Sequence, residues 1–413
     1  MTDDAPPRAH AWSAAFDSDL LTDYVPDALG AADVSRQLAL GQPLDDGPLR
    51  VGRMRVPLAR RTESIPILPC VERARMFLLT EQALTVHAPR SEVFSYRSLT
   101  WRYRPAYQAR QRHLQALAAR SDLPLALVLD VHRFGQSLPL NTLIRAPWMT
   151  EHLAGALTAL RTAAGRTLLP GHRWSNRLGT AALAPLDDTV AALAPGRWAR
   201  WGDDLHVLVR DRAEADEIRS AVVVALQQLG LSLSQEKCTV APAASVLTGP
   251  ARVIDGRPEE VWRTGLANGD VKALRYGLSR SPPDERVTRT LVAAVQNRPA
   301  LLPRAVHYLD RAAHTPVGQA ATKELLHTVE ADAFTAARLL ALAARHPELA
   351  PEVPAEMLAA ADNSGIAPLL ELAFRVDVLR GRLRARPPTS RMREWLASGA
   401  HPHHQLPQVT TLL

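Results

Sequence analysis

The sequence predicts an α+β protein whose mixed N-terminal part precedes an all-helical C-terminal part. Between about residues 50 and 245, amphipathic helical segments alternate with short apolar strands. Beyond Val253 the strand signals end, and Ala/Leu-rich helical segments alternate with breaks that contain Pro or Gly. Two of these segments, 291–303 and 339–351, place Pro-x-Leu-x-Pro after an apolar helix, 48 residues apart. That spacing is typical of HEAT or armadillo repeats, with an ordinary helical bundle as the alternative.

The elements of the mixed part follow from hydrophobic periodicity. Apolar residues at helical spacing predict helices over 77–87, 105–120, 148–165 and 214–230, and continuous apolar runs predict strands over 123–131, 206–209 and 238–242. Gly165 and Gly230 follow two of the helices at the position where a left-handed residue ends a helix. The strand over 123–131 is apolar throughout except for Asp130 near its end, which is typical of a buried strand.

A chain of 413 residues is long enough for two domains and a leader. We expect an acidic, partly helical leader over 1–48, a mixed domain over 49–250, a helical-repeat domain over 251–400 and a flexible tail over 401–413. The tail holds three histidines, but its terminal position and its prolines favour disorder over a metal site.

Composition excludes several classes of protein. The chain is 46% hydrophobic with a mean hydropathy of −0.11, and its longest apolar runs are far shorter than the roughly 20 residues that span a membrane. The first ten residues, MTDDAPPRAH, lack the apolar core of a signal peptide. The two cysteines, Cys70 and Cys238, stand in unrelated contexts, which argues against a disulfide framework or a zinc knuckle. We therefore expect a cytoplasmic protein without a membrane partner.

Charge is distributed unevenly along the chain. Between Arg50 and Arg120 there are 14 arginines against four glutamates, a local charge of +10 that exceeds the +7 of the whole chain. The first 46 residues hold nine aspartates. Coding bias accounts for the choice of Arg over Lys but not for the scarcity of acids in this window. Guanidinium groups pair with phosphate oxygens through two parallel hydrogen bonds, so the window predicts a polyanionic partner.

Three carboxylates are the candidate catalytic groups. Asp203 and Asp204 follow Gly202 between two apolar runs, which is typical of a solvated hairpin turn and also of a turn that holds a metal. Asp130 ends a buried strand, where an ionised carboxylate needs a cation nearby. Three carboxylates from a strand end and a neighbouring hairpin would hold two Mg²⁺ ions about 4 Å apart.

Five segments occur in the order of the motifs of reverse transcriptases. They are FSYR (94–97), LVLDVHRF (127–134), the Gly- and Ser-containing stretch 168–190, RWGDDLHVLV (200–209) and LGLSLSQEKCTV (229–240). Over about residues 50–250 the chain therefore resembles reverse transcriptases, specifically the bacterial antiviral or abortive-infection group with a helical-repeat C-terminus. The resemblance implies a right-hand palm and fingers followed by a HEAT-like domain.

The resemblance also assigns roles to residues. It implies that Asp130, Asp203 and Asp204 bind the two Mg²⁺ ions and that Lys237 protonates the departing pyrophosphate. The implied substrate-binding residues are Arg97, which grips the incoming triphosphate, and Phe134, Gly135, Gly171, Ser175, Asn176 and Trp201.

The chain departs from the family pattern at three places. The aromatic side chain that excludes a ribose 2′-OH is expected five residues after Asp130, where Gly135 stands, while Phe134 stands at four. Either Gly135 relaxes the discrimination between sugars, or a shift of one residue lets Phe134 perform it. Trp201 replaces a tyrosine, and Leu168 and His172 replace glycines in the stretch that supports the template.

The resemblance implies an RNA-directed DNA polymerase that adds nucleotides to a 3′ or protein hydroxyl. The resemblance implies a role in antiphage defence, and its departures make template-independent synthesis a variant. The expected partners are RNA or single-stranded DNA, dNTPs and further copies of the chain. The alternative is a catalytically silent palm-fold protein that binds RNA and assembles through its helical repeats. Asp187 and Asp188 are expected to start a helix as caps.

Overall fold

The structure, a computed structural model, describes residues 49, 51–57, 62–95, 103–120, 122–170, 172–247 and 257–382. The expected leader (1–48) and tail (401–413) lie outside these residues. The described chain is mixed α+β and divides into two compact units. We call residues 73–247 the sheet unit, and residues 51–72 with 257–382 the helical unit. In the described part of the chain, no helix is long and apolar enough to cross a membrane.

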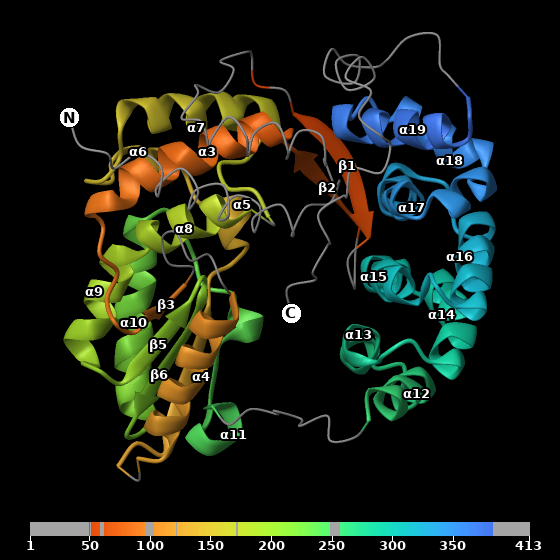
Figure 1. The fold of residues 1–413 in the computed structure, drawn as a ribbon. Helices are drawn as coiled ribbons and strands as arrows, with labels where there is room; N and C mark the ends of the chain where they lie inside the picture. Colours follow the sequence, from red (N-terminus) through yellow and green to blue (C-terminus); the bar gives the residue numbers. More distant parts are fainter. Residues whose placement is uncertain are drawn as a thin grey trace, which may run out of the picture. The chain divides into compact units, whose positions relative to one another are not determined.

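The sheet unit is built on a five-stranded sheet of order β3-β5-β6-β4-β7 (Figure 1). The strands are β3 (Val93–Phe94), β4 (Leu125–Asp130), β5 (Trp198–Trp201), β6 (Asp204–Val209) and β7 (Thr239–Pro242). β3 runs parallel to β5, and every other pair is antiparallel. The apolar run that ends in Asp130 therefore forms a strand inside the sheet, as its composition predicts.

Nine α-helices accompany the sheet in the described residues of this unit: α3 (Cys70–Ala83), α4 (Tyr103–Ala118), α5 (Phe134–Ser137), α6 (Leu140–Ile144), α7 (Glu151–Ala164), α8 (Arg173–Ala182), α9 (Ala184–Leu193), α10 (Arg212–Gln228) and α11 (Ala243–Leu247). The four helices expected from periodicity correspond to α3, α4, α7 and α10, although α3 begins seven residues before the expected start and ends at Ala83. Thr150 caps the start of α7 by accepting from the Leu153 amide, and Gly165 ends it at φ +74°.

Side-chain alternation gives the sheet two different faces. On one face Ala126 of β4 and Leu208 of β6 pack with Leu114 of α4. Asp130 and Asp204 lie at even spacing from these residues and therefore point to the same face. We call this the α4 face. The opposite face carries Arg200 of β5, which lies against α8 and α9.

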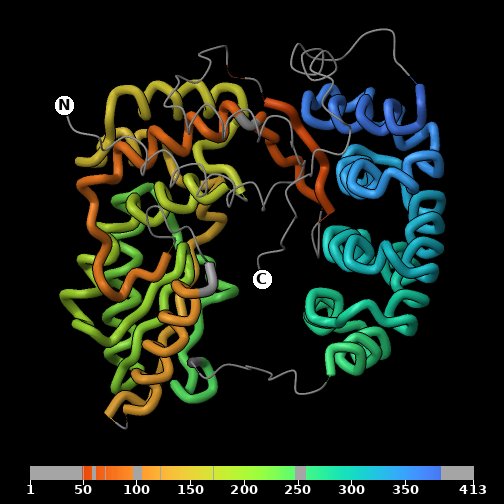
Figure 2. Tube along the Cα trace, in the orientation of Figure 1, coloured from red at the N-terminus to blue at the C-terminus, as the bar shows by residue number. Residues whose placement is uncertain are grey.

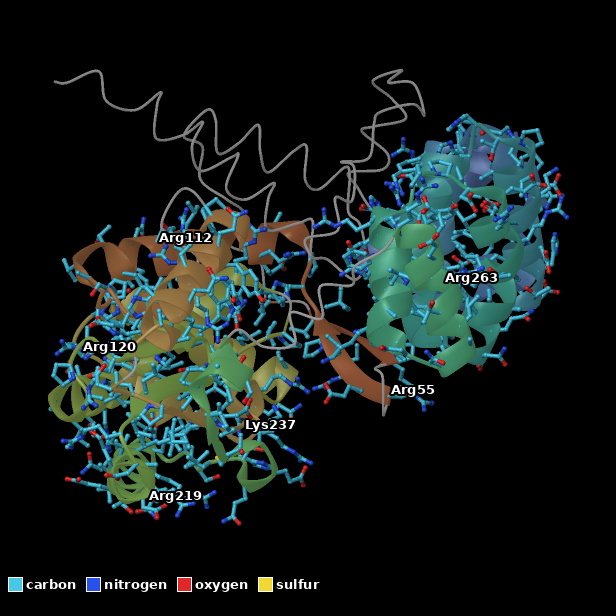
Figure 3. The ribbon with its side chains drawn as sticks, turned by 90° about the horizontal axis from the view of Figure 1, so that it is seen from below. Arg55, Arg112, Arg120, Arg219, Lys237 and Arg263 are labelled. Atoms are coloured by element: carbon cyan, nitrogen blue, oxygen red, sulfur yellow. The ribbon has the colours of Figure 1, made fainter. Side chains whose placement is uncertain are left out.

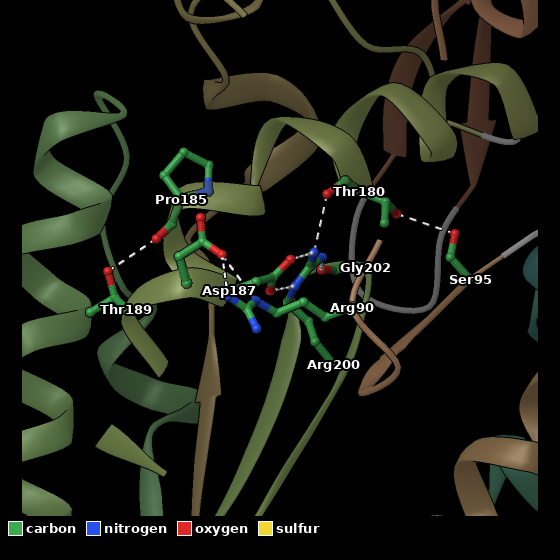
Figure 4. Close-up of polar contacts among 9 residues, drawn as sticks. Arg90, Ser95, Thr180, Pro185, Asp187, Thr189, Arg200 and Gly202 are labelled. Atoms are coloured by element: carbon green, nitrogen blue, oxygen red, sulfur yellow. Dashed lines mark hydrogen bonds and ion pairs between the residues drawn. The ribbon is translucent and has the colours of Figure 1, made fainter. Parts of the chain in front are cut away.

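Arg200 fixes the β5–β6 hairpin from that opposite face (Figure 4). Its guanidinium is fully buried and donates two hydrogen bonds of 2.6 Å to the carboxylate of Asp187 in α9. It also donates to the Gly202 carbonyl at 2.7 Å and to the Thr180 carbonyl at 3.1 Å. The position of the turn that carries Asp203 is thereby tied to two helices.

This pairing corrects the expectation for Asp187 and Asp188. Helix α9 begins at Ala184, so both residues lie inside it rather than at its cap. Asp187 is buried and forms an ion pair with Arg200. Asp188 forms an exposed ion pair with Arg90 at 2.8 Å. Both aspartates therefore have structural roles, as expected. These roles come from ion pairs with distant arginines, which the local sequence does not reveal.

Eight α-helices make up the described C-terminal part of the helical unit: α12 (Pro258–Asn268), α13 (Val271–Arg280), α14 (Glu285–Asn297), α15 (Leu302–Ala312), α16 (Pro316–Thr328), α17 (Ala333–Arg345), α18 (Ala355–Asn363) and α19 (Ala367–Leu379). Figure 2 shows them following one another from green to blue. Alternate helices contact each other and form two rows. One row contains α12, α14 and α16, and the other contains α13, α15, α17 and α19.

The two rows correct the repeat spacing expected from sequence. The similar segments 291–303 and 339–351 both form a helix that ends before a 3-10 turn starting at Pro299 or Pro347. They belong to α14 and α17, which lie in different rows, so they are not equivalent positions of a repeat. The equivalent helices α13, α15 and α17 begin at Val271, Leu302 and Ala333, 31 residues apart.

A two-stranded hairpin belongs to the helical unit, although the sequence placed it in the mixed domain. β1 (Gly52–Pro57) pairs antiparallel with β2 (Thr62–Ile67). Met54, Val56, Ile65 and Ile67 are each 1–2% exposed and join the hydrophobic core of the C-terminal helices. Burial of the alternating apolar side chains of the hairpin accounts for the boundary lying near residue 72 instead of residue 49.

The two neighbouring aspartates of α9 provide a matched test of the anchor. Asp187→Asn leaves the Arg200 guanidinium buried without its charged partner, so we expect the free energy of unfolding to fall by about 3 kcal/mol. Asp188→Asn removes an exposed ion pair from the same helix and is expected to change it by less than about 1 kcal/mol. Urea unfolding followed by circular dichroism measures both, and equal effects would contradict an anchoring role for Asp187.

Candidate functional site

The turn between β5 and β6 is a two-residue hairpin. Trp201 and Asp204 are its last paired residues, with Gly202 and Asp203 at the tip. Gly202 has φ +60°, a backbone conformation that residues with a Cβ rarely adopt. A turn with a positive φ at its first central residue matches the twist of the flanking strands, which explains the glycine before the two aspartates.

The sheet register brings the strand-end carboxylate to this hairpin. β4 pairs with β6 over six residues, from Leu125 opposite Val209 to Asp130 opposite Asp204. Residues paired across an antiparallel ladder have Cα atoms about 4.5–5.5 Å apart, and their side chains share one face. Asp130 is 5% exposed, Asp203 is half-buried and Asp204 is exposed. Two carboxylates that are 74 positions apart in the chain are therefore neighbours, and Asp203 is next to them.

The surroundings of Asp203 and Asp204 disfavour their negative charge. Partial desolvation at the end of the sheet, followed by the charge of Asp130, raises the pKa of Asp204 above its ordinary value of 3.8, although part of the side chain stays exposed. Burial also raises the pKa of Asp203, and the charges of Asp130 and Asp204 add to the rise. Such a cluster favours a cation at this end of the sheet.

Lys237 supplies one positive charge to the cluster. Its Nζ donates to Oδ1 of Asp130 at 2.9 Å and to Oδ2 at 2.8 Å. These hydrogen bonds raise the pKa of Lys237, so its ammonium stays charged at neutral pH. The lysine is 64% exposed and stands just before β7, which pairs with β4 on the side away from β6. The structure therefore brings together all four residues predicted to be catalytic.

The fit of a divalent metal has one favourable and one unfavourable aspect. Carboxylate oxygens are the ligands that Mg²⁺ prefers, and Asp130, Asp203 and Asp204 provide them. In the conformation shown, however, both oxygens of Asp130 are bonded to Lys237, and the described residues contain no group of three His, Cys, Asp or Glu side chains arranged for a metal. In this conformation the ammonium of Lys237 would compete with a metal ion for the carboxylate of Asp130.

Two residues near the carboxylates, Arg110 of α4 and His206 of β6, were missed by sequence reasoning. Arg110 is 8% exposed, and its Nη2 lies 3.1 Å from Nδ1 of His206, two residues after Asp204 on the same face. Burial and the nearby Arg110 charge lower the pKa of His206 to about 4, so this imidazole is neutral and accepts the hydrogen bond. Period-two spacing from Asp204 would have placed His206 on this face, but no local signal identifies Arg110.

Trp201 lies on the α4 face beside the carboxylates. Its ring meets the ring of Tyr107 in α4 edge to face, with centroids 6.0 Å apart. Trp201 is half-buried, so part of its surface is open to a bound molecule. Its ring is an apolar surface beside the aspartates, and its role under a primer end stays a prediction.

Phe134 and Gly135 occupy different surroundings. Phe134 is 9% exposed, and its ring packs on Gly179 so closely that a Cβ at Gly179 would lie 2.8 Å from it. A Cβ built on Gly135 meets no atom of the protein within 4 Å. The ring of Phe134 is therefore held in the protein core, and the space beside Gly135 is open.

Of the remaining predicted substrate-binding residues, the structure describes Ser175 and Asn176, which differ in exposure. Arg97 and Gly171 lie outside the described residues. Ser175 is 3% exposed, and its hydroxyl accepts from the Leu169 amide at 2.9 Å, which is a structural role. Asn176 is exposed on α8.

The arginines of the basic window over 50–120 differ in their surroundings: some are buried, some form ion pairs and some are exposed. Arg73 and Arg110 are buried, and Arg90 and Arg120 form exposed ion pairs with Asp188 and Asp122. Arg112, on α4, is exposed, and Figure 3 shows it at the surface of the sheet unit. The expectation that the whole window serves a polyanion is therefore too broad, since several of its charges stabilise the fold.

No family model matches the chain, and no curated protein matches it. The likeness to reverse transcriptases accordingly depends on the motif residues and their arrangement.

The raised pKa of Asp204 leads to a test by pH. A carboxylate whose pKa is raised by folding is destabilising when ionised, and this effect is lost as the pH falls to its ordinary value of 3.8. Without divalent cations at pH 7, Asp204→Asn should raise the melting temperature by about 2 °C, a small gain because the exposed charge is screened. Below about pH 4 the gain should vanish.

Calorimetry over pH 3.5–7.5 measures this difference. Asp216→Asn, which removes an exposed carboxylate from α10, is the control and should show no such pH-dependent gain. An Asp204→Asn variant that is less stable than wild type at pH 7 would contradict the electrostatic argument.

Proposed function

We propose that the sheet unit is the palm and part of the fingers of an RNA-directed DNA polymerase. One observation carries the proposal: the β4–β6 register sets Asp130 opposite Asp204, with Asp203 in the adjoining turn and Lys237 on Asp130. Polymerases need carboxylates from a strand end and a neighbouring hairpin at the same place.

The reaction proposed is the transfer of a nucleotide to a 3′ or protein hydroxyl. Asp130, Asp203 and Asp204 would hold two Mg²⁺ ions, which when bound lower the pKa of the attacking hydroxyl and neutralise the triphosphate. Lys237 carries a proton beside these carboxylates and would deliver it to the departing pyrophosphate. Trp201 would support the primer end.

The wider role follows from the resemblance. The helical unit would be the HEAT-like domain of the antiviral or abortive-infection group, through which copies of the chain associate. RNA or single-stranded DNA and dNTPs would be the partners, and antiphage defence in the cytoplasm the context. The raised pKa values of Asp203 and Asp204 support the need for bound cations.

A second function has an observation in its favour. Because Lys237 bonds to both oxygens of Asp130, the cluster is neutralised in part without a metal. A catalytically silent palm-fold protein that binds RNA would retain this pairing permanently. The two functions differ in whether Mg²⁺ displaces Lys237 and turnover follows.

A polymerisation assay separates them. Full-length protein with Mg²⁺ and labelled dNTPs, with and without an RNA template, is expected to yield product that is reduced at least about 1000-fold in Asp203→Ala/Asp204→Ala. Asp211→Asn, a change at the helix cap just beyond β6, serves as the control and should retain activity.

Each outcome of this assay decides one question. Equal product from the wild type and the double variant would contradict the assignment of the site. RNA binding without product from either would favour the silent binder, and product without a template would identify template-independent synthesis.

Gly135 gives the proposed polymerase a distinctive sugar preference. The packing of Phe134 against Gly179 and the open space beside Gly135 support a site that admits a 2′-hydroxyl. We therefore favour relaxed sugar discrimination over gating by Phe134.

Replacing the glycine tests this preference. Wild type should incorporate CTP within about tenfold of dCTP, and Gly135→Phe should lower use of CTP by a further factor of about ten or more, since steric exclusion of one group contributes about 1–3 kcal/mol. Primer-extension kinetics with each nucleotide measure the ratio. Gly155→Ala, at an open position on α7, is the control, and strict use of dCTP by wild type would refute the idea.

A further inference from the structure

The two rows of the helical unit differ in charge. Helices α13, α15 and α17 together contain seven Lys and Arg side chains against a single carboxylate, Asp310. The matching helices of the other row, α12, α14 and α16, contain four basic and four acidic side chains. Figure 1 shows the two rows as separate layers. The excess positive charge therefore belongs to one layer.

Five basic side chains of this layer interact with one another or with Asp310, and we call them the basic cluster. It consists of Arg275 of α13, Arg304, His307 and Arg311 of α15, and Arg345 of α17. The three members on α15 recur at spacings of three and four, so they lie on one face of that helix. Each is half-buried.

The cluster has few acceptors for its charge. Arg304 donates to the Ser279 hydroxyl at 3.4 Å and Arg311 to the Leu278 carbonyl at 2.8 Å, both neutral groups. Asp310 is shared by Arg345 at 3.3 Å and by His346 at 2.8 Å. Nη1 of Arg345 and Nε of Arg311 are buried without a hydrogen-bond partner.

Burial and the excess of positive charge lower the pKa values of Arg304 and His307, and burial lowers that of Arg345. Burial and the charge of Arg275 lower the pKa of Arg304, and burial lowers the pKa of Arg345 despite Asp310. Burial, Arg311, Arg304 and Arg345 lower the pKa of His307, which Asp310 only partly offsets. An anion bound at the surface of the cluster would relieve the repulsion among its positive charges.

We propose that the basic cluster binds the backbone phosphates of a single-stranded nucleic acid. The inference rests on the proposed function in so far as that function makes nucleic acid a partner of the chain. It adds a second binding surface, on the helical unit, to which neither the motifs nor the catalytic residues contribute.

The width of the cluster favours a strand over a single phosphate. Packed helices lie about 8–10 Å apart, so side chains from three successive helices extend over about 20 Å. One phosphate group is contacted by two or three such side chains, and the rest would remain unused. Successive phosphates of an extended strand would use all of them.

The test uses full-length protein and a fluorescent 20-mer of thymidylate, with chelator present so that no turnover occurs. Arg275→Gln/Arg304→Gln removes two charges from the cluster. Arg263→Gln/Arg286→Gln removes two exposed charges from α12 and α14, and Figure 3 shows Arg263 at the surface of the helical unit. Anisotropy titrations at several salt concentrations give the affinity and its salt dependence for each protein.

The cluster variant is expected to bind about tenfold more weakly, and its slope of log affinity against log salt should fall by about 1.4, since each lost contact to a single strand contributes about 0.7. The control should lose less than about twofold. Equal losses in both variants, or none in the cluster variant, would overturn the proposal. Arg275→Gln alone, expected to lose about threefold, decides the matter should the double variant misfold.

A parallel titration with pyrophosphate and dTTP distinguishes the source of the phosphate. If the cluster variant loses these ligands but binds the 20-mer as wild type does, the cluster is a site for free phosphate compounds and the strand proposal fails. Because binding is measured without turnover, an inactive polymerase leaves the inference standing. An active polymerase whose cluster variant binds normally refutes only the inference.

Discussion

The pairing of β4 with β6 is the constraint on which the candidate site depends. Six residue pairs in antiparallel register carry Asp130 to a position opposite Asp204, and a shift of one residue would send one of these carboxylates to the other face of the sheet. The interiors of both strands are apolar on the face away from α4, so burial specifies the register. Hydrophobic packing thus holds like charges together, and Lys237 offsets part of their repulsion.

The residues that anchor the β5–β6 hairpin and the residues of the candidate site lie on opposite faces of the sheet. Arg200 reaches Asp187 and the Gly202 carbonyl on one face, while the carboxylates, Arg110 and Trp201 occupy the other. A residue that anchors the turn is therefore buried and unavailable to a ligand. The arrangement ties the turn to α8 and α9 although three neighbouring carboxylates repel each other.

The helical unit shows the same division between packing and charge. Its core unites the eight C-terminal helices with the apolar side of the β1–β2 hairpin, whereas one layer of helices carries an excess of arginine. Half-buried arginines with neutral partners contribute little to folding stability, because their desolvation opposes their hydrogen bonds. Their grouping in one layer is more readily explained by an external anion than by the fold.

Local patterns were enough to predict the α+β class, four helices of the sheet unit, the strand that ends at Asp130 and the hairpin at Gly202, because periodicity and turn chemistry act over a few residues. The order of the motifs predicted Asp130, Asp203, Asp204 and Lys237 as the catalytic residues. Only the tertiary structure showed that Asp187 pairs with Arg200, that Arg110 reaches His206 and that the hairpin over 52–67 belongs with the helices. It also showed that equivalent helices of the helical unit begin 31 residues apart, whereas the sequence suggested a repeat of 48 residues. These features join residues far apart in the chain, and such contacts are chosen by burial and charge across the folded molecule, which no short segment records.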